Sequence, residues 1–565
     1  MSGTTGTGPL SIAEDPLDGD WHPGEWWTTT NMGEALPGVL TPLTWSFCGP
    51  KLERAVREGF IAIGAASRKL RVQPTDERAW ALGIFHGRTA VNVQFLGRLA
   101  DGMPGTSGAA MAEQWFGVIP EGFVSRPSRR RYPAVLVRLP RAALTASRAS
   151  RDAHARTDTW WRREVAAAPG TDLTQARELL AFASGVYGEV LITHITAQMA
   201  AVQPMFESVQ KLAAAAGMAE RTHQLLTGQG EHAEAALLES LWRVSRGTQS
   251  LKGFLDRHGC HAPSDGDLAS PSWREDPTPV LALLRRYREL ADDEGPLELA
   301  RRRAAEREAA TMELLRRTPR SRRPLARLIL HLATRATPLR GIAKEAGQKA
   351  IDVGRAAARR IGEHLEAAGS IDDATDVFYL MLPEVRAVVP GTPLQELVAQ
   401  RREQREAHLR VTLPSAWRGR PIVEATQDAI AIEPGTIITG TGACAGVAEG
   451  PVRVVQDPAE TNLEPGEILV ATFTDPGWAA LMFVAAGMIV DIGGLQSHAA
   501  VTARELGVPC IMGTHDAMQR LRTGDIVRLD GQTGTVELLR HAASAGATPR
   551  RHRAEGGACQ PPPNG

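Results

Sequence analysis

Cysteine is scarce in this sequence, and its few copies form no pattern. The chain has 5 cysteines, namely Cys48, Cys260, Cys444, Cys510 and Cys559. They include no Cys-x-x-Cys pair, and the number is odd. This arrangement argues against a disulfide framework and against a zinc knuckle, and it suits a reducing compartment. We therefore expect no metal site and a cytoplasmic protein.

Long apolar runs and net charge are also missing. Lys+Arg and Asp+Glu each number 64, so the formal net charge is zero, and this balance gives no reason to expect a nucleic-acid or membrane partner. The start of the chain lacks the basic-then-apolar pattern of a signal peptide. The most apolar run, Ala479–Val490, is too short to span a membrane. Lysine is rare beside arginine, a skew that we attribute to base composition rather than to a binding surface.

One stretch near the C-terminus carries the clearest chemical signal. The β-favouring run Met488–Val490 is followed by two glycines, and apolar residues then recur at helical spacing after His498 until Gly507 and Pro509. This pattern predicts a strand, a glycine turn and a helix. His498 then lies in the first turn of the helix, where unpaired N–H groups and the helix dipole favour an anion.

The residues around His498 fit a phosphoryl carrier. A neutral imidazole is a good nucleophile toward phosphorus. Ser497 is predicted as the N-cap of the helix, and Gly493 and Gly494 allow a sharp turn and a close approach to a bulky anion. The alternative to a phosphoryl carrier is an ordinary α/β turn with an exposed histidine.

The segment 493–509 resembles the phosphohistidine swivelling ("mobile") domain of the phosphoenolpyruvate-utilising enzymes, the family of phosphoenolpyruvate synthase, pyruvate phosphate dikinase and rifampicin phosphotransferase. It follows their Gly-Gly-x-Thr-Ser-His-Ala-Ala-x-x-Ala-Arg-Glu-x-Gly-x-Pro pattern except at Gln496, where the family usually has Thr. The resemblance implies that His498 is phosphorylated. It also implies that Gly493, Gly494, Ser497 and Arg504 bind the phosphate.

The preceding part of the chain is predicted to be mostly helical. A clear case is the stripe of Ile351, Ala358, Ile361 and Leu365, which ends at Gly369. The earlier stretch 26–46 is rich in turn formers and aromatics and is predicted to be a packed, irregular loop. It resembles the start of the acceptor-binding region of rifampicin phosphotransferase-like proteins, and that resemblance implies substrate-binding roles for Asn31, Glu34 and Thr41. Structural turn roles are an equal alternative for these residues.

Two departures from the relatives affect the expected site. Cys260 and His261 stand where the relatives have His-Arg, so a fixed cation suited to phosphate is replaced by histidine. Where the relatives carry Arg-Glu-x-x-Lys/Arg facing the transferring phosphate, this chain has Arg340, Gly341 and Lys344, with Glu345 as a possible replacement for the lost carboxylate. Two cations remain at i and i+4, on one helical face. A solvated basic face is the alternative.

The sequence thus predicts a multidomain protein in which a large, mostly α-helical domain precedes a compact α/β (β/β/α) phosphohistidine swivelling domain. We expect a disordered start at 1–20, a helical acceptor- and substrate-binding domain at 21–410, a linker at 411–435, the swivelling domain at 436–540 and a loose tail at 541–565. The strands of the swivelling domain are expected at 452–455, 468–470, 488–490, 509–512, 526–529 and 535–538.

Neither an ATP-grasp domain, a phosphoenolpyruvate-binding barrel nor a Gly-x4-Gly-Lys-Ser/Thr loop is found in the sequence. We therefore expect no cofactor on this chain, and ATP and Mg on a separate ATP-grasp partner.

Three functions follow from these features. The first is a phosphotransferase component that carries a phosphoryl group on His498 to an apolar small-molecule acceptor in the helical domain. Arg340 and Lys344 would neutralise charge, and His261 or His194 would act as general base, although each histidine could equally be structural. The second is a condensation or dehydration enzyme of secondary metabolism that uses the same phosphohistidine. The third is a non-catalytic scaffold or binder, which would predict erosion of a motif that is intact.

Overall fold

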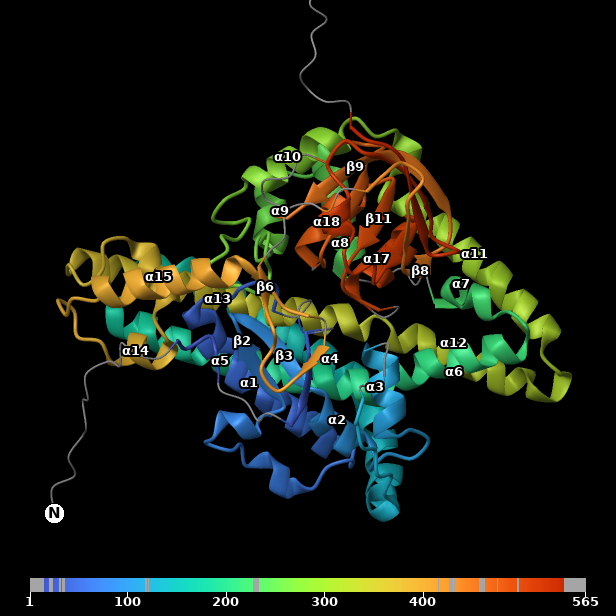
Figure 1. Ribbon diagram of the computed structural model, residues 1–565, viewed down its shortest axis with the longest axis horizontal. Helices are drawn as coiled ribbons and strands as arrows, with labels where there is room; N and C mark the ends of the chain where they lie inside the picture. Colours follow the sequence, from blue (N-terminus) through green and yellow to red (C-terminus); the bar gives the residue numbers. More distant parts are fainter. Residues whose placement is uncertain are drawn as a thin grey trace, which may run out of the picture.

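The computed structural model of the 565-residue chain describes residues 15–19, 24–29, 32, 36–116, 119, 121–226, 233–414, 416–425, 430, 432–456, 463–474, 476–494 and 497–542. A helical region occupies the first three quarters of the chain, and a sheet domain follows it (Figure 1). The long helix α13 (Leu339–Ala367) crosses the middle of the molecule, and the sheet domain, in orange and red, lies above it.

The helices of the first region are α1 (Pro42–Ala62), α2 (Val93–Ala100), α3 (Gly108–Phe116), α4 (Tyr132–Ala167), α5 (Leu173–Ala197), α6 (Gln203–Ala215), α7 (Thr222–Leu226), α8 (Ala233–Ser245), α9 (Leu251–His258), α10 (Thr278–Tyr287), α11 (Pro296–Arg317), α12 (Arg323–Ala336), α13, α14 (Leu382–Ala387) and α15 (Gln395–Leu409). The π-helical turn η5 (Gln198–Val202) joins α5 to α6. Their main core lies between α1, α4, α5 and α13. As predicted, α13 ends just before Gly369, since Ala368 is its C-cap.

The joined helix Leu173–Ala215 is long and apolar enough to cross a membrane by length and composition. Its first part, α5, packs along α1 and α13 in the main core, and its last part, α6, packs on α12 in the arm.

The helices α6, α7, α11 and α12 form an arm at the right of Figure 1. The arm has its own apolar core, which includes Val209, Leu225, Leu314 and Ala333.

A small sheet in the first region corrects two predictions. Its strands are β2 (Leu82–Phe85), β3 (Arg88–Asn92), β1 (Trp26–Thr28) and β5 (Ala416–Arg418), in that order. The predicted irregular loop 26–46 is therefore wrong at both ends: β1 begins it, and α1 starts at Pro42, because proline is well suited to the first turn of a helix.

The predicted linker 411–435 is also too long. β4 (Val411–Thr412) pairs with β6 (Glu424–Ala425), and β5 pairs with β1. Trp417 of β5 is buried with Trp27, Phe85 and Ala90. Apolar burial therefore fixes 416–418 to the helical region, so this part of the predicted linker belongs to the first region.

The C-terminal domain contains the eight-stranded sheet β7 (Ile437–Thr439), β14 (Thr535–Arg540), β13 (Ile526–Asp530), β9 (Val447–Val455), β10 (Ile468–Ala471), β11 (Gly487–Val490), β12 (Cys510–Met512) and β8 (Thr441–Cys444), given in spatial order. The predicted strands are confirmed. β9, β10, β11 and β12 are parallel, and the others are antiparallel. The helices are α16 (Ala479–Met482), α17 (His498–Leu506) and α18 (Ala517–Arg520).

The C-terminal domain does not stand apart from the helical region. Leu241 of α8 and Leu284 of α10 share one apolar core with Leu469, Leu481 and other residues of the C-terminal domain. The Tyr287 hydroxyl donates to the Ala480 carbonyl at 3.3 Å. Figure 1 shows α8, α9 and α10 beside the sheet domain. The segment α8–α10 thus docks this domain with α17 facing the helical region.

Candidate active site

His498 lies where the sequence pattern predicted, at the start of α17. The Ser497 side chain accepts from the Ala500 N–H at 3.2 Å, so Ser497 is the N-cap. The helix ends before Gly507. The predicted strand, turn and helix are therefore confirmed, and they set His498 in the first helical turn.

Two threonines hold the His498 ring. Thr474 Oγ1 lies 3.0 Å from Nδ1, and Thr502 Oγ1, one helical turn away, lies 3.1 Å from Nε2. The ring is 4% exposed. Burial lowers the pKa of His498 well below its ordinary value, and the charges of Lys344, Arg340 and His261 lower it further. His498 is therefore a neutral imidazole at pH 7, as a nucleophile must be.

Of the two glycines in the turn before α17, only Gly493 lies at a position that requires glycine. Gly493 has φ of +140°, and a Cβ there would lie 2.5 Å from Met512 Cε. A Cβ on Gly494 would meet no atom within 4 Å. Open space beside Gly494 is compatible with the predicted approach of a phosphate to this turn.

The start of α13 and the helix α5 carry charged and titratable groups that act on His498 or on the same cations as it. Arg340 and Lys344 lower the pKa of both His498 and His194, so the structure brings the predicted cations and both histidines into one electrostatic environment. The pKa of His194 is lowered to about 3, mainly by burial. Among the described residues, no group donates to or accepts from its Nδ1. The π-helical turn η5 begins four residues later, and such turns often occur at functional sites.

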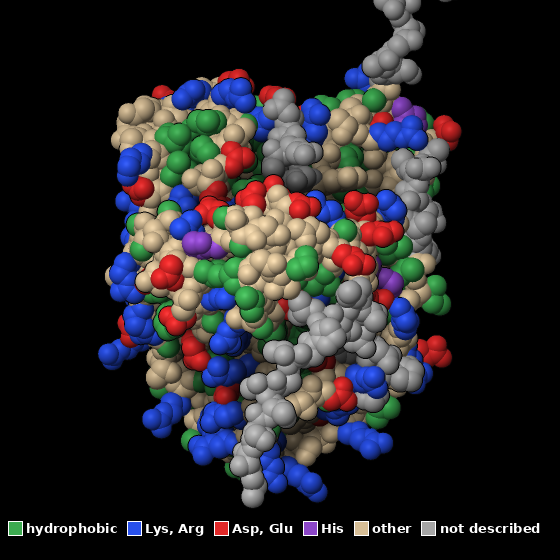
Figure 2. All heavy atoms as spheres, turned by 90° about the vertical axis from the view of Figure 1, so that its left-hand side faces the viewer, with side chains coloured by type: hydrophobic (Ala, Val, Ile, Leu, Met, Phe, Trp, Pro, Cys, Tyr) green, Lys and Arg blue, Asp and Glu red, His purple; other side chains and the backbone are tan. Residues whose placement is uncertain are grey.

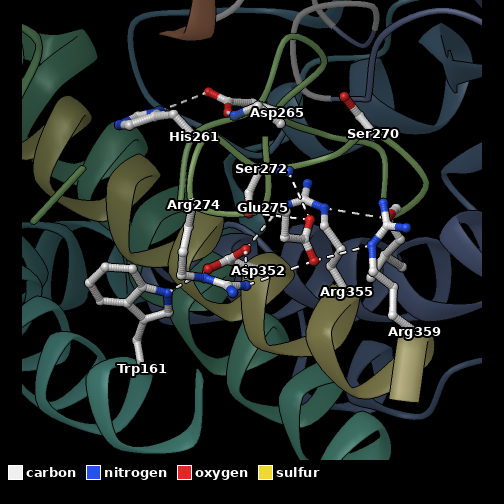
Figure 3. Close-up of polar contacts among 12 residues, drawn as sticks. Trp161, His261, Asp265, Ser270, Ser272, Arg274, Glu275, Asp352, Arg355 and Arg359 are labelled. Atoms are coloured by element: carbon white, nitrogen blue, oxygen red, sulfur yellow. Dashed lines mark hydrogen bonds and ion pairs between the residues drawn. The ribbon is translucent and has the colours of Figure 1, made fainter. Parts of the chain in front are cut away.

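His261 forms a buried pair with Asp265. His261 Nδ1 lies 3.1 Å from Asp265 Oδ2 (Figure 3). The same Oδ2 accepts from Gln348 Nε2 at 2.6 Å, and the Ala262 N–H donates to Oδ1 at 2.8 Å. Burial alone would lower the pKa of His261, but the Asp265 carboxylate outweighs it and the pKa is raised. An imidazole oriented in this way can accept a proton from a substrate.

His261 lines a small recess, with free space of about 10 Å³, between α8, α13 and the loop after α9. Gly341, Lys344, Glu345 and Gln348 lie on its α13 side. The recess therefore joins the predicted base to one of the predicted cations.

Glu345 lines this recess together with Gly341, which has no side-chain carboxylate. It is already paired with Lys349 at 2.8 Å and with His154 at 3.2 Å. Burial would raise the pKa of Glu345, but His154 and Lys349 lower it further than burial raises it. Lys349 also contacts Asp158 at 2.7 Å. Glu345 thus restores a carboxylate to the site, but one that is already paired with Lys349 and His154.

A buried ionic network fixes the loop that carries His261 to α13. Asp352 accepts from Trp161 Nε1 at 2.8 Å and pairs with Arg355 at 3.2 Å and with Arg274 at 3.4 Å (Figure 3). Arg355 also donates to the Asp267 carbonyl at 3.0 Å. The oppositely charged side chains of Asp352 and Arg355 are buried, and they fix the loop to α13. Arg340 and Lys344 also lie on α13, so the loop is held in place relative to both cations.

Other predicted residues lie elsewhere or cannot be placed. Arg504 Nη1 contacts the Ala443 carbonyl on β8 at 3.3 Å, so its predicted phosphate role stays a prediction. Thr41 is buried, and its hydroxyl donates to Asp267 at 3.3 Å, which is a structural contact. Asn31 and Glu34 lie outside the described residues, as does Gln496. Among the described residues, no group of three or more His, Cys, Asp or Glu is placed to hold a metal ion.

Several residues of the site were not predicted. Thr502 lies four residues after His498 on the predicted helix, and this spacing could have identified it. Asp265 also lies four residues after His261, but both residues are in the loop after α9, so helical spacing does not identify it. Thr474 and Gln348 contact the site only through the tertiary fold, and no local pattern marks them.

Comparison with known families agrees with this geometry. Residues 463–534, which include His498 and both threonines, match the model "PEP-utilising enzyme, mobile domain". These residues are a PEP-utilising enzyme mobile domain. Residues 193–341, which include His194, His261 and Arg340, match the model "Rifampicin phosphotransferase fourth domain".

Several proteins of known sequence are similar to this chain. A rifampicin phosphotransferase of Streptomyces sviceus is 31% identical over 319 residues, which are 54% of this chain and 36% of the relative. An uncharacterised protein of Mycobacterium bovis is 30% identical over 341 residues, 60% of this chain and 36% of the relative. An uncharacterised phosphotransferase of Bacillus subtilis is 36% identical over 191 residues, 32% of this chain and 23% of the relative. The aligned part is thus about a third or less of each relative's length.

Proposed function

We propose that this chain is a phosphotransferase component in which His498 of the mobile domain carries a phosphoryl group to a small-molecule acceptor. The observation that carries the proposal is the neutral, buried His498 imidazole in the same electrostatic environment as Arg340, Lys344 and His261. The matches to a mobile domain and to rifampicin phosphotransferases support it.

In the first half-reaction, a ring nitrogen of His498 attacks the phosphorus of a donor. A P–N bond forms, and the P–O bond to the donor breaks. A hydroxyl can donate or accept, so Thr474 and Thr502 can hold either tautomer. The nitrogen that attacks gives up its threonine contact, and the other threonine keeps the ring in place. ATP and Mg would be bound by an ATP-grasp partner.

In the second half-reaction, an acceptor hydroxyl attacks the phosphorus and the P–N bond breaks. The acceptor proton passes to His261, which Asp265 holds by Nδ1 and whose Nε2 is left for the proton. Arg340 and Lys344 neutralise the charge on the phosphoryl oxygens. Phosphoryl transfer depends mainly on such positioning and neutralisation. The imidazole of His498 is regenerated in its neutral form.

A second outcome is favoured by one observation, the His261–Asp265 pair at a position where the related enzymes have arginine. A base in this position can remove a proton from a phosphorylated acceptor as well as from a hydroxyl. The phosphate would then leave in a condensation or dehydration. The two outcomes differ in whether phosphate is found in the product or as free inorganic phosphate, which ³¹P NMR distinguishes.

Intact-protein mass tests the carrier. The wild type, His498→Asn and His515→Asn are incubated with ATP and an extract of the source cells. His515 is an exposed histidine of the same domain, and asparagine tolerates its positive φ of 67°, so it is a matched control. We expect an acid-labile phosphoryl group on the wild type and on His515→Asn, and none on His498→Asn. If no protein gains mass in an extract shown to contain an active ATP-grasp protein, the proposal fails.

A further inference from the structure

The sequence around α12 combines a high positive charge with a complete lack of carboxylates. Residues 314–344 contain nine arginines and lysines and no aspartate or glutamate. The neutral total charge of the chain hides this local excess. On the end of the molecule shown in Figure 2, opposite the arm, acidic and basic side chains are interspersed. The excess charge at α12 is therefore local, and the face shown in Figure 2 does not share it.

The α12 helix has two apolar faces, and only one of them is buried in the protein. Ala326 and Ala333 are buried in the arm core. Leu325, Leu328 and Leu332 lie on a different face and are 59%, 52% and 41% exposed. Their i, i+3, i+7 spacing makes a continuous stripe along the helix. An exposed stripe of three leucines at the surface of the arm needs an apolar partner.

The stripe is flanked by arginines that are available to a partner. Arg320, Arg322, Arg327 and Arg335 are exposed. Within the part of the chain that the structure describes, none of these four forms an ion pair with a carboxylate. By contrast, Arg316 and Arg317 at the end of α11 pair with Glu313. A helix with exposed leucines between unpaired arginines has the composition of an interfacial membrane helix.

We propose that the α12 stripe (Leu325, Leu328 and Leu332, with Arg320, Arg322, Arg327 and Arg335) docks the arm onto an anionic lipid bilayer. The arginines would meet the lipid phosphates, and the leucines would enter the headgroup–acyl boundary. A nucleic acid would match the arginines but would gain nothing from the leucines. This revises the expectation, drawn from total charge, that no membrane is involved. It is independent of the role of His498.

Vesicle flotation of the full chain tests the docking surface. The probes are unilamellar vesicles of phosphatidylglycerol and phosphatidylcholine in equal amounts, and vesicles of phosphatidylcholine alone. We expect the wild type to bind the anionic vesicles and to bind the neutral ones far more weakly. Binding should weaken as NaCl is raised from about 0.05 to about 0.5 M, because salt screens the attraction.

Paired variants separate the two parts of the surface. Each arginine near an anionic surface strengthens binding about fivefold, so Arg322→Gln/Arg327→Gln should weaken it about 30-fold. Leu328→Gln/Leu332→Gln should weaken it at least about tenfold. The matched controls, Arg68→Gln/Arg386→Gln and Val389→Gln/Leu409→Gln, change exposed residues far from α12 in the sequence and should bind as the wild type does.

All of the changed side chains are exposed, so circular dichroism and the thermal midpoint should match those of the wild type. Three results overturn the proposal: no binding of the wild type to anionic vesicles, equal binding to neutral and anionic vesicles, or wild-type binding by both α12 variants. Phosphorylation of His498 is measured separately, so failure here leaves the proposed function untouched.

Discussion

The His261–Asp265 pair gives the sharpest test of the proposed transfer mechanism, through the variant Asp265→Asn. Asp265 accepts three hydrogen bonds, from His261, Gln348 and the Ala262 N–H. Asparagine has one acceptor oxygen. If that oxygen keeps the Ala262 contact, the amide NH₂ faces two donors, and His261 can no longer present Nδ1–H to a carboxylate. The variant therefore loses the orientation of the proposed base while the fold around it stays nearly the same size.

The magnitude follows from the half-reaction in which His261 acts. A positioned general base contributes about 100- to 10,000-fold, which is about 3 to 5 kcal/mol. We expect Asp265→Asn to slow loss of phosphate from His498 to the acceptor about 100-fold. Formation of phospho-His498 should change little, because that step does not use His261. Leaving buried donors unpaired should lower the free energy of unfolding by about 1–3 kcal/mol.

As pH rises, the stability contributed by His261 should fall, and the rate of phosphoryl transfer should increase. The pKa of His261 in the folded protein is raised above its ordinary value. Its pairing with Asp265 therefore stabilises the fold fully below about pH 6.5, the unfolded pKa, and this contribution is lost as pH rises through the folded pKa. Base-catalysed transfer needs neutral His261 and should rise over the same range. Both dependences should be weaker in Asp265→Asn.

The assay follows decay of phospho-His498 by intact mass after the protein is phosphorylated with ATP and extract, desalted and returned to acceptor-containing extract. The control is Asp525→Asn, which breaks a second His–Asp pair, with His541 at 3.3 Å, in the mobile domain. It should cost stability without slowing transfer. The reasoning is refuted if Asp265→Asn transfers at the wild-type rate, or if it slows phosphorylation of His498 as much as it slows transfer.

Three further predictions follow from the mobile domain. Because burial and the charges of Lys344 and Arg340 lower the pKa of His498 in this arrangement, its ring should stay neutral from about pH 8 to about pH 6 and protonate only below that; Lys344→Gln should move the protonation to higher pH in an NMR titration of the unphosphorylated protein, and an unchanged titration would contradict this. Gly493→Ala should destabilise the domain by about 1–3 kcal/mol in urea unfolding, owing to its positive φ and the Met512 contact, whereas Gly494→Ala should unfold as the wild type does; equal midpoints for the two variants would contradict this. Leu241→Ala, in the core shared by α8 and the mobile domain, should cost about 2–5 kcal/mol and speed hydrogen exchange in α17; unchanged exchange there would show that α8 does not hold the domain.

The local structure around His498 could be predicted from sequence because each part of it is encoded locally. Ser497 caps the helix through its own side chain, and Gly493 turns the chain through its own backbone. The six predicted strands were found for the same reason, since buried strands are continuous apolar runs. The i, i+4 spacing of Arg340 and Lys344 likewise fixed their common face before their surroundings were known.

The rest of the site depends on contacts between segments far apart in the chain. Thr474 follows β10 and contacts His498, which follows the neighbouring strand β11, and Gln348 of α13 contacts Asp265 in the loop after α9. The strand at Ala416–Arg418 looked like part of a linker because its partner, β1, is nearly four hundred residues away. Periodicity is a property of one segment, so it cannot identify such partners.

The shared core of α8–α10 and the mobile domain constrains how phosphate could be carried. His498 is 4% exposed in this arrangement, so a partner that binds ATP cannot reach it here. If the mobile domain moved alone, Leu241, Leu284 and the facing Leu469 and Leu481 would all become exposed to water. Burying each such side chain is worth about 1.5–3 kcal/mol, so the cost would be large. If α8–α10 moved with the domain, that core would stay intact, and His498 would instead leave the electrostatic environment of Arg340 and Lys344. We expect the second movement, because water and the phosphate donor site can replace that environment, and a disulfide between α8 and the mobile domain should then leave phosphorylation of His498 possible.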